Sequence, residues 1–157
     1  MAFEFEDLSE AAEVGDFKQV KKILNANPEL IKGKDEYEFS ILHGAVMTEN
    51  VKMIDYLIDQ GAEVNARNDE GITPLHLALD PQVAARLLDR GALIDAASDD
   101  GSTPLHTQVS DGEERLDVVE LLLTRGANRE AKNRKGHTPL EIALQREDEE
   151  MAAQLRK

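Results

Sequence analysis

Apolar residues recur at three- and four-residue spacing in short stretches along the chain, and these stretches come in pairs. The second stretch of a pair reads VKMIDYLIDQG, QVAARLLDRG or LDVVELLLTRG, and each ends in a glycine. Because one face of an α-helix repeats every 3.6 residues, this spacing predicts short amphipathic helices. A terminal glycine is typical of the left-handed residue that follows a helix. The pattern therefore predicts an all-α chain built from helix pairs.

The first stretch of each pair begins with a related sequence. In three copies Thr precedes Pro, so the Thr can cap a helix whose first turn tolerates the missing N–H of Pro. A polar turn such as ARNDEG comes before the Thr-Pro. Phased copies of this kind indicate a repeat protein. The copies are EFSILHGAV from Glu38, GITPLHLAL from Gly71, GSTPLHTQV from Gly101 and GHTPLEIAL from Gly136, at intervals of 33, 30 and 35 residues.

The period and the Thr-Pro-Leu-His sequence resemble the ankyrin repeat. The resemblance extends upstream to LSEAAEVGDFKQVKKILNANPELI from Leu8, and downstream to a final helix pair over Leu140–Leu155. It implies an all-α solenoid of stacked helix-turn-helix units with short β-hairpin or turn fingers. We expect a single domain, 1–157, whose first and last repeats are caps. The expected repeats are approximately 5–37, 38–70, 71–100, 101–135 and 136–157.

The repeats differ in length between the Leu of the first helix and the Gly that ends the second. Because stacking on neighbours should set helix lengths, we expect the differences to fall in the turn between the helices. That turn shrinks to Asp80-Pro81 in the short copy and expands to residues 110–115, including Asp111, in the long copy. Asp80 and Asp111 then contribute to recognition, or the turns have drifted neutrally. The separations are 16 residues from Leu75 to Gly91, 19 from Leu42 to Gly61 and 21 from Leu105 to Gly126.

His43, His76 and His106 occupy equivalent positions and are the side chains most easily taken for a metal site. Stacked helix axes lie roughly 8 to 10 Å apart, which is too far for a shared metal with ligand bonds of about 2 Å. We expect each histidine to bond to a neighbouring repeat instead. A catalytic set of Thr73, His76 and Asp69 is disfavoured, because nothing should hold the base against the nucleophile. No catalytic residue, metal or cofactor is expected.

Two acidic turns and one acidic run also invite a chemical interpretation. The turns 68–71 and 98–101 lack the alternating acids and the closing Glu of a calcium loop. The run 147–150 opens the last helix, where carboxylates favour the positive end of the helix dipole. A solvated helix cap is therefore expected there rather than a ligand cluster.

The charge balance restricts the class of partner. The chain holds 32 acidic and 18 basic residues and no cysteine, with a formal charge of −14. This balance argues against a nucleic acid or an anionic membrane as the partner. The N-terminus MAFEFEDLSE is unlike a signal peptide, and no apolar stretch approaches the ~18 to 20 residues of a membrane span. A cytoplasmic protein that binds a basic protein surface is expected.

The polar turns should project as fingers from one edge of the stack, above a groove lined by the first helices. Ankyrin-repeat proteins generally bind other proteins through these two surfaces, and the resemblance implies the same here. Residues 60–120 hold 13 acidic and 4 basic side chains, whereas residues 124–146 hold 6 basic and 2 acidic. This reversal serves either partner orientation or solubility alone. The first finger presents Glu36, Tyr37 and Phe39, the second Asp69, Glu70 and Ile72, the third Asp99, Asp100 and Ser102, and the fourth Arg134, Lys135 and His137.

Affinity usually depends on a few buried aromatic or large apolar anchors. Tyr37 and Phe39 of the first finger, with Met47 at the end of the following helix, are candidates. Phe39 stands where the other fingers have smaller residues. Its ring either awaits a partner or is half-buried against the adjacent finger.

These observations favour a non-enzymatic, monomeric module that captures one protein partner with a basic face. An inhibitor or an immunity-type antidote would match this description. One alternative is a scaffold or adaptor fragment of a larger ankyrin-repeat protein. Another is a small-ligand or enzymatic groove, for which the sequence supplies no converging set of His, acid and nucleophile.

Overall fold

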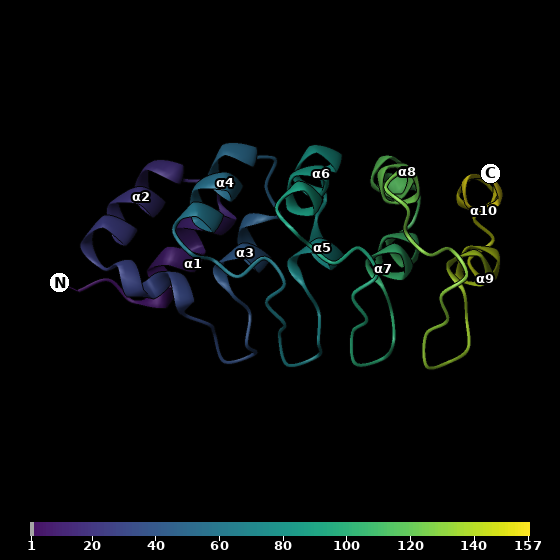
Figure 1. Ribbon diagram of the computed structural model, residues 1–157, viewed down its shortest axis with the longest axis horizontal. Helices are drawn as coiled ribbons and strands as arrows, with labels where there is room; N and C mark the ends of the chain where they lie inside the picture. The colour runs from purple at the N-terminus through teal and green to yellow at the C-terminus, as the bar shows by residue number, and fades with distance from the viewer. Residues whose placement is uncertain (1) are drawn as a thin grey trace.

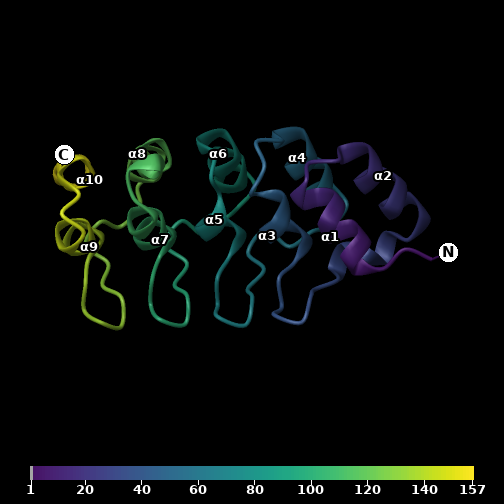
Figure 2. The ribbon, with the colours of Figure 1, turned by 180° about the vertical axis from the view of Figure 1, so that it is seen from behind.

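The computed structural model describes residues 2–157, which form a single row of stacked helix pairs (Figure 1). The first helices of the pairs make the lower layer in Figure 1, the second helices make the upper layer, and the termini lie at opposite ends. Figure 2 shows the same two layers from behind. The pairs are α1 (Phe5–Glu13) with α2 (Phe17–Ala26), α3 (Ile41–Ala45) with α4 (Val51–Asp59), α5 (Pro74–Leu77) with α6 (Pro81–Asp89), α7 (Pro104–Asp111) with α8 (Leu116–Thr124), and α9 (Pro139–Gln145) with α10 (Glu149–Arg156).

Two short 3₁₀ helices complete the described elements. η1 (Pro28–Lys32) follows α2, and η2 (Glu113–Arg115) leads into α8. None of the helices in residues 2–157 has the length and apolar character required to cross a bilayer. The predicted all-α ankyrin-type architecture is thus confirmed.

The core lies between the two layers and runs along the whole row. Each pair contributes buried leucines, isoleucines or valines at the three- and four-residue spacing seen in the sequence. Leu42, Leu75 and Leu105 of the first helices are essentially inaccessible to solvent, as are Leu57 and Leu87 of the second helices. Since burial of one such side chain is worth about 1.5–3 kcal/mol, stacking of the repeats supplies most of the stability.

Polar residues define the ends of the helices as predicted. Thr73, Thr103 and Thr138 are the N-cap residues of α5, α7 and α9, with Pro in the first turn. In the last copy, Thr138 Oγ1 accepts the N–H of Glu141 at 3.3 Å, and the Glu141 carboxylate accepts the N–H of Thr138 at 2.7 Å. Asp148 caps α10 by accepting the N–H of Met151 at 2.9 Å, so the acidic run does open the last helix. The capping residue itself is buried, at 8% exposure, and not solvated as expected.

The length differences are divided between the first helices and the turns, which corrects in part the expectation that they would all fall in the turn. The turn has five residues (46–50) after α3 and three (78–80) after α5, whereas the extra length of the long copy lies mainly in α7. α5 has 4 residues and α7 has 8, whereas α4, α6 and α8 have 9 each. The second helices α4, α6 and α8 keep one length and pack on one another, so the variation falls outside them. The expected long turn is accordingly shared between the end of α7 and η2.

The fingers connect the second helix of one pair to the first helix of the next and project below the lower layer in Figure 1. They are turns and not β-hairpins: in residues 2–157 the only bridge is an isolated antiparallel one between Lys34 and Ser40. Neighbouring fingers are joined by main-chain hydrogen bonds at one repeated position. The N–H groups of Asp69, Asp99 and Arg134 donate to carbonyls of the preceding finger, at 3.1, 2.9 and 2.8 Å. These bonds hold the finger tips in a row.

Candidate functional site

An Asn or Asp side chain shapes three of the four fingers from inside. Asn68 Oδ1 accepts the N–H groups of Glu70 and Ile72, at 3.0 and 2.7 Å. Asp35 and Asn133 make the same pair of bonds in the first and fourth fingers. Sequence reasoning missed this position, although a short polar residue five places before Ser or Thr marks it in each copy. The tips are therefore ordered before any partner binds.

The third finger has Ser98 at this position, and the carboxylate of Asp100 accepts hydrogen bonds within the finger instead. Asp100 Oδ1 accepts the Ser98 hydroxyl at 2.6 Å and the Ser102 N–H at 2.9 Å. The hydrogen bond from the Ser98 hydroxyl, with that from Ser102, holds the pKa of Asp100 below its usual value. One carboxylate oxygen of Asp100 is thus already hydrogen-bonded within its own finger, so Asp100 is less free than Asp69 to bind a partner.

The acidic side chains at the tips of the second and third fingers are not equivalent. Asp99 lies 3.2 Å from the guanidinium of Arg67, which also donates to the carbonyl of Ala97. In contrast, none of the cations that the structure describes lies within ion-pair distance of Asp69 or Glu70. Among the described residues, both tip carboxylates of the second finger are therefore without a cation partner, whereas Asp99 of the third finger has one.

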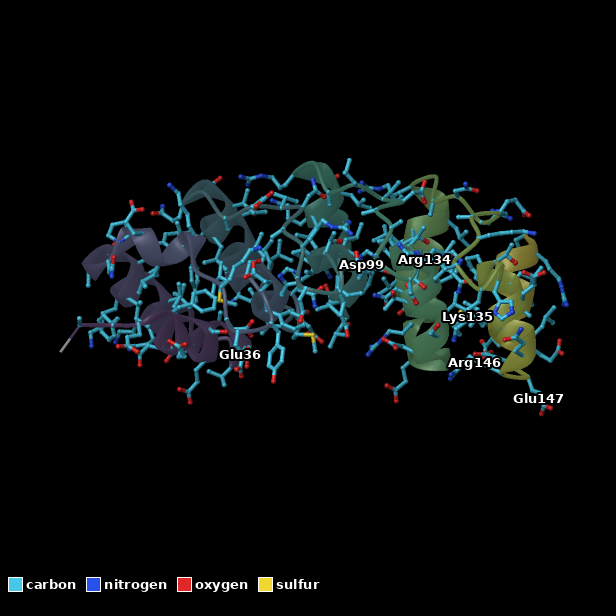
Figure 3. The ribbon with its side chains drawn as sticks, turned by 90° about the horizontal axis from the view of Figure 1, so that it is seen from below. Glu36, Asp99, Arg134, Lys135, Arg146 and Glu147 are labelled. Atoms are coloured by element: carbon cyan, nitrogen blue, oxygen red, sulfur yellow. The ribbon has the colours of Figure 1, made fainter. Side chains whose placement is uncertain are left out.

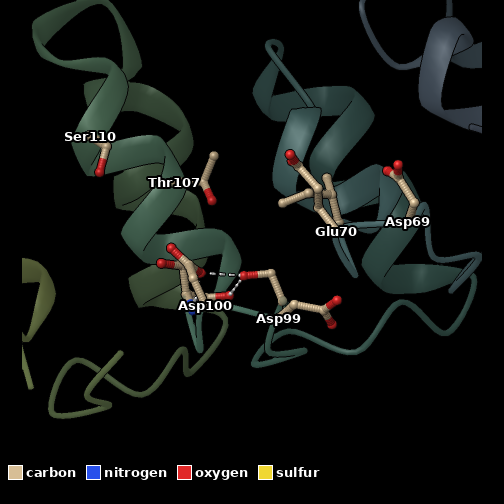
Figure 4. A pocket seen from close by; sticks show the side chains of 9 residues that line it. Asp69, Glu70, Asp99, Asp100, Thr107 and Ser110 are labelled. Carbon is tan, nitrogen blue, oxygen red and sulfur yellow. Dashed lines mark hydrogen bonds between the residues drawn. The ribbon is translucent and has the colours of Figure 1, made fainter. Parts of the chain in front are cut away.

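The second and third fingers and α7 enclose a hollow of about 490 Å³, here called the acidic groove (Figure 4). Thr107 and Ser110 form its wall on α7, one turn apart, and face the carboxylates across the hollow. Six of the residues predicted on the second and third fingers line this hollow. The groove is lined by Asp69, Glu70, Ile72, Ser98, Asp99, Asp100, Ser102, Thr107 and Ser110.

A second hollow of about 510 Å³, here called the apolar hollow, lies toward the N-terminal end of the row. Phe39, Met47 and Leu77 give it an apolar lining, and Glu13 and Asp35 stand at its rim. Met47 is 49% exposed. Phe39 is half-buried, but against His43 of its own repeat, with the rings edge to face and 5.2 Å between centroids.

The fourth finger reverses the charge of the edge. Arg134 and Lys135 are exposed and follow Glu36 and Asp99 along the row in Figure 3, with Arg146 near Lys135. None of these three cations is within ion-pair distance of a carboxylate that the structure describes.

Three further residues that were predicted to contact a partner make bonds within the fold. Asp80 accepts the N–H groups of Gln82 and Val83 as the N-cap of α6. Asp111 ends α7 with its carboxylate 3.8 Å from Arg115. His137 is half-buried, and its carbonyl accepts a bond from the preceding repeat. These residues contribute to the local fold before any contact with a partner.

The three aligned histidines tie each repeat to the next. The Nε2–H groups of His43, His76 and His106 donate to carbonyls of the following finger at 2.9, 3.0 and 3.0 Å. In His76 the other ring nitrogen, Nδ1, accepts the N–H of Thr73 at 3.1 Å. Burial lowers the pKa of both His43 and His76, although the hydrogen bonds to backbone partly oppose this. The structural role predicted for the histidines is confirmed.

The Thr73 hydroxyl does lie against an imidazole, 2.9 Å from His76 Nδ1, contrary to our expectation that nothing would hold such a pair together. Thr73 and His76 are only 2% and 0% exposed. Because no substrate can reach a buried hydroxyl whose imidazole is already bonded at both nitrogens, the pair works as a cap and not as a nucleophile. In residues 2–157, no three His, Asp or Glu side chains converge as metal ligands.

The opposite face carries a ladder of ion pairs that the sequence analysis missed. Arg86 and Arg90 of α6 both contact Asp55 of α4, and Arg90 also contacts Asp59. The pattern continues in the next pair, since Arg125, which follows α8, lies 2.8 Å from Asp89 at the end of α6. The signal was present as Asp and Arg at matching places in DYLIDQG, ARLLDRG and LLLTRG. Several acids of the second-helix face, Asp55, Asp59 and Asp89, thus have arginine partners.

Comparison with known proteins agrees with this architecture. The family model of ankyrin repeats (3 copies) matches residues 8–97 and 80–157. The chain belongs to the ankyrin-repeat family. Ankyrin repeats mediate protein–protein interaction, and this is the general function of the chain.

Relatives of this ankyrin-repeat protein come from varied organisms. Mouse protein phosphatase 1 regulatory subunit 27 is 34% identical over 128 residues, which is 82% of this chain and 62% of that protein. The ankyrin repeat protein FPV024 of fowlpox virus is 34% identical over 103 residues, 64% of this chain and 17% of that protein. Potassium channel AKT1 of Arabidopsis thaliana is 40% identical over 68 residues, 43% of this chain and 8% of that protein. The chain therefore spans less than two thirds of each of these relatives.

Proposed function

We propose that this ankyrin-repeat protein captures one protein partner by seating a basic part of that partner in the acidic groove. The observation that carries the proposal is that two carboxylates without a cation partner in the described part of the chain, Asp69 and Glu70, line a hollow. On the second-helix face, Asp55 and Asp89 each have an arginine partner. In the acidic groove, Asp69 and Glu70 have none among the residues that the structure describes.

Uncompensated charges in a concave wall attract an opposite charge more strongly than the same charges on a flat surface. The hollow restricts water on one side, so field lines are concentrated toward its opening. At physiological salt, screening limits such attraction to about 8 Å. A lysine or arginine that enters the groove approaches within this range, and the Thr107 and Ser110 hydroxyls offer it further acceptors.

Capture of a partner gives this protein a regulatory or inhibitory function. The relative named protein phosphatase 1 regulatory subunit 27 is consistent with a protein that acts by binding. An adaptor within a larger assembly would use the same groove. No chemistry on the partner is part of the proposal, which describes a monomeric, non-enzymatic protein of the cytoplasm.

Affinity purification from the source cells tests the proposal. Wild-type bait is compared with a variant in which Asp69, Glu70, Asp99 and Asp100 are replaced by Lys, and captured proteins are identified by mass spectrometry. We expect a specific partner with wild-type bait and its loss with the variant. The matched control carries Asp117→Lys and Glu120→Lys, two exposed acids on α8, and should retain the partner. Retention by the groove variant, with circular dichroism showing that it is folded, would overturn the proposal.

A further inference from the structure

We infer that the surface from the apolar hollow through the acidic groove to the fourth finger recognises an extended segment of the partner. This segment carries a large apolar, a basic and an acidic side chain at four-residue intervals. This inference rests on the proposed function and adds the order and spacing of the recognised groups. Three features of the surface, in sequence along the row, support it.

The apolar hollow supplies the first subsite. Phe39, Met47 and Leu77 line it, and Met47 remains 49% exposed. The tip of the first finger, which carries Phe39, also exposes Tyr37, at 56%. Exposed apolar side chains around a hollow lose contact with water when a large side chain enters, and such burial is the main source of affinity at protein interfaces. A leucine-sized side chain is therefore the group that fits here.

The second and third subsites carry opposite charges. Asp69 and Glu70 leave the acidic groove negative, and Arg134 and Lys135 make the fourth finger positive. A ligand aligned with this order meets an attractive charge at both places. If its basic and acidic groups are exchanged, each faces a like charge, which penalises that arrangement.

The stacking distance sets the spacing. The apolar hollow is centred near α3, the acidic groove between α5 and α7, and the basic finger leads into α9. Consecutive subsites are therefore about one and a half helix spacings, or roughly 12 to 15 Å, apart. An extended chain rises about 3.3 Å per residue, so four residues span roughly 13 Å. Because side chains of an extended chain alternate between two sides, a separation of four keeps all three groups on one side, whereas five does not.

Synthetic peptides of Gly and Ser provide the test. The ordered peptide places Leu, Arg and Glu four residues apart. One control has the same composition in the order Arg, Leu, Glu, and another places the three groups five residues apart. Titration into ¹⁵N-labelled protein, followed by backbone amide shifts, should give saturable changes at Met47, Leu77, Asp69 and Lys135. We expect both control peptides to bind at least about 10-fold more weakly.

Protein variants separate the subsites. Met47→Glu should abolish the preference for the ordered peptide over its variant with Ala in place of Leu. The matched control Leu93→Glu changes an exposed leucine outside both hollows, 61% exposed, and should leave the preference intact. Equal binding of the ordered and permuted peptides, or absence of binding by the ordered peptide, would overturn the inference. Loss of partner capture on charge reversal of the groove would still support the proposed function in either case, so the two failures are distinguishable.

Discussion

The side-chain amide of Gln108 in α7 donates a hydrogen bond to the main-chain carbonyl of Ala78, at 3.0 Å, and a second to that of His76, at 2.9 Å. Helix α5 ends at Leu77, so both carbonyls lack the partners that a further turn would provide. Gln108 is fully buried and comes from the following repeat. The shortened helix is therefore stabilised by its neighbour.

Replacement of Gln108 by the similarly shaped Met should destabilise the protein by about 2 kcal/mol, because it leaves two buried carbonyls without donors. Urea unfolding followed by circular dichroism measures the change. Gln82→Met, at an exposed position of α6, is the control and should alter stability little. A Gln108→Met protein as stable as wild type would show that the carbonyls are satisfied in another way.

Two glycines with the same backbone conformation should differ in their response to alanine. Gly136 and Gly101 both have φ of +79°, but a Cβ on Gly136 meets nothing within 4 Å, whereas one on Gly101 lies 2.9 Å from the backbone nitrogen of Arg134. Gly136→Ala should cost about 1 kcal/mol, the penalty for a left-handed residue. Gly101→Ala should cost about 1 kcal/mol more, because it also strains the bond that joins the third and fourth fingers. Thermal unfolding compares the pair, and equal losses would contradict the steric explanation.

Stability should fall as the pH decreases below neutrality, owing to His43 and His76. Burial lowers the pKa of both from the ordinary value of 6.5, so below that pH the unfolded chain binds more protons than the folded one. Their contribution is complete above pH 6.5 and is lost as the pH falls through the lowered folded-state pKa values.

Urea unfolding between about pH 7.5 and 5 measures this effect before most carboxylates titrate. Replacement of His76 by Gln removes one titrating group and should flatten the profile. A His76→Gln protein with an unchanged slope would show that other groups cause the dependence.

Substitution of Asp100 should mainly reduce stability, whereas substitution of Asp69 on the neighbouring finger should mainly reduce binding. Asp100→Asn weakens the bonds from the Ser98 hydroxyl and the Ser102 N–H, and should destabilise the exposed finger by up to about 1 kcal/mol. Asp69→Asn breaks no side-chain bond that the structure describes, so it should leave stability unchanged and slow association with the captured partner. Chemical unfolding and surface plasmon resonance give the two readouts. The assignment is wrong if Asp69→Asn proves the more destabilising change.

Association itself should depend on salt if the acidic groove steers the partner. Raising the salt concentration from about 0.05 to 0.5 M shortens the screening length about threefold, so the association rate should fall steeply while dissociation changes less. Stopped-flow measurements with the purified partner provide the rates. The variant with four Lys in the groove supplies the reference. A wild-type association rate that does not change with salt concentration would exclude electrostatic steering.

Local sequence determined the repeat, its helix pairs and the caps, because each depends on residues close together in the chain. Thr73, Pro74 and His76 define the start of α5 by chemistry that is visible within four positions. The row of finger residues followed from alignment of the copies, since stacked repeats place equivalent residues side by side. The same alignment predicted that the histidines would bond across repeats.

Only the tertiary structure decided which of these residues retain free charge and where the chain was shortened. Asp99 and Asp69 look alike in sequence, but Arg67 reaches Asp99, about thirty residues away in the chain, and leaves Asp69 uncompensated. The loss of a turn from α5 likewise depends on Gln108, whose contacts lie 30 and 32 residues away. Such partners are set by the stacking of neighbouring repeats. The sequence pattern of one repeat therefore does not predict which side chains of the next repeat will contact it.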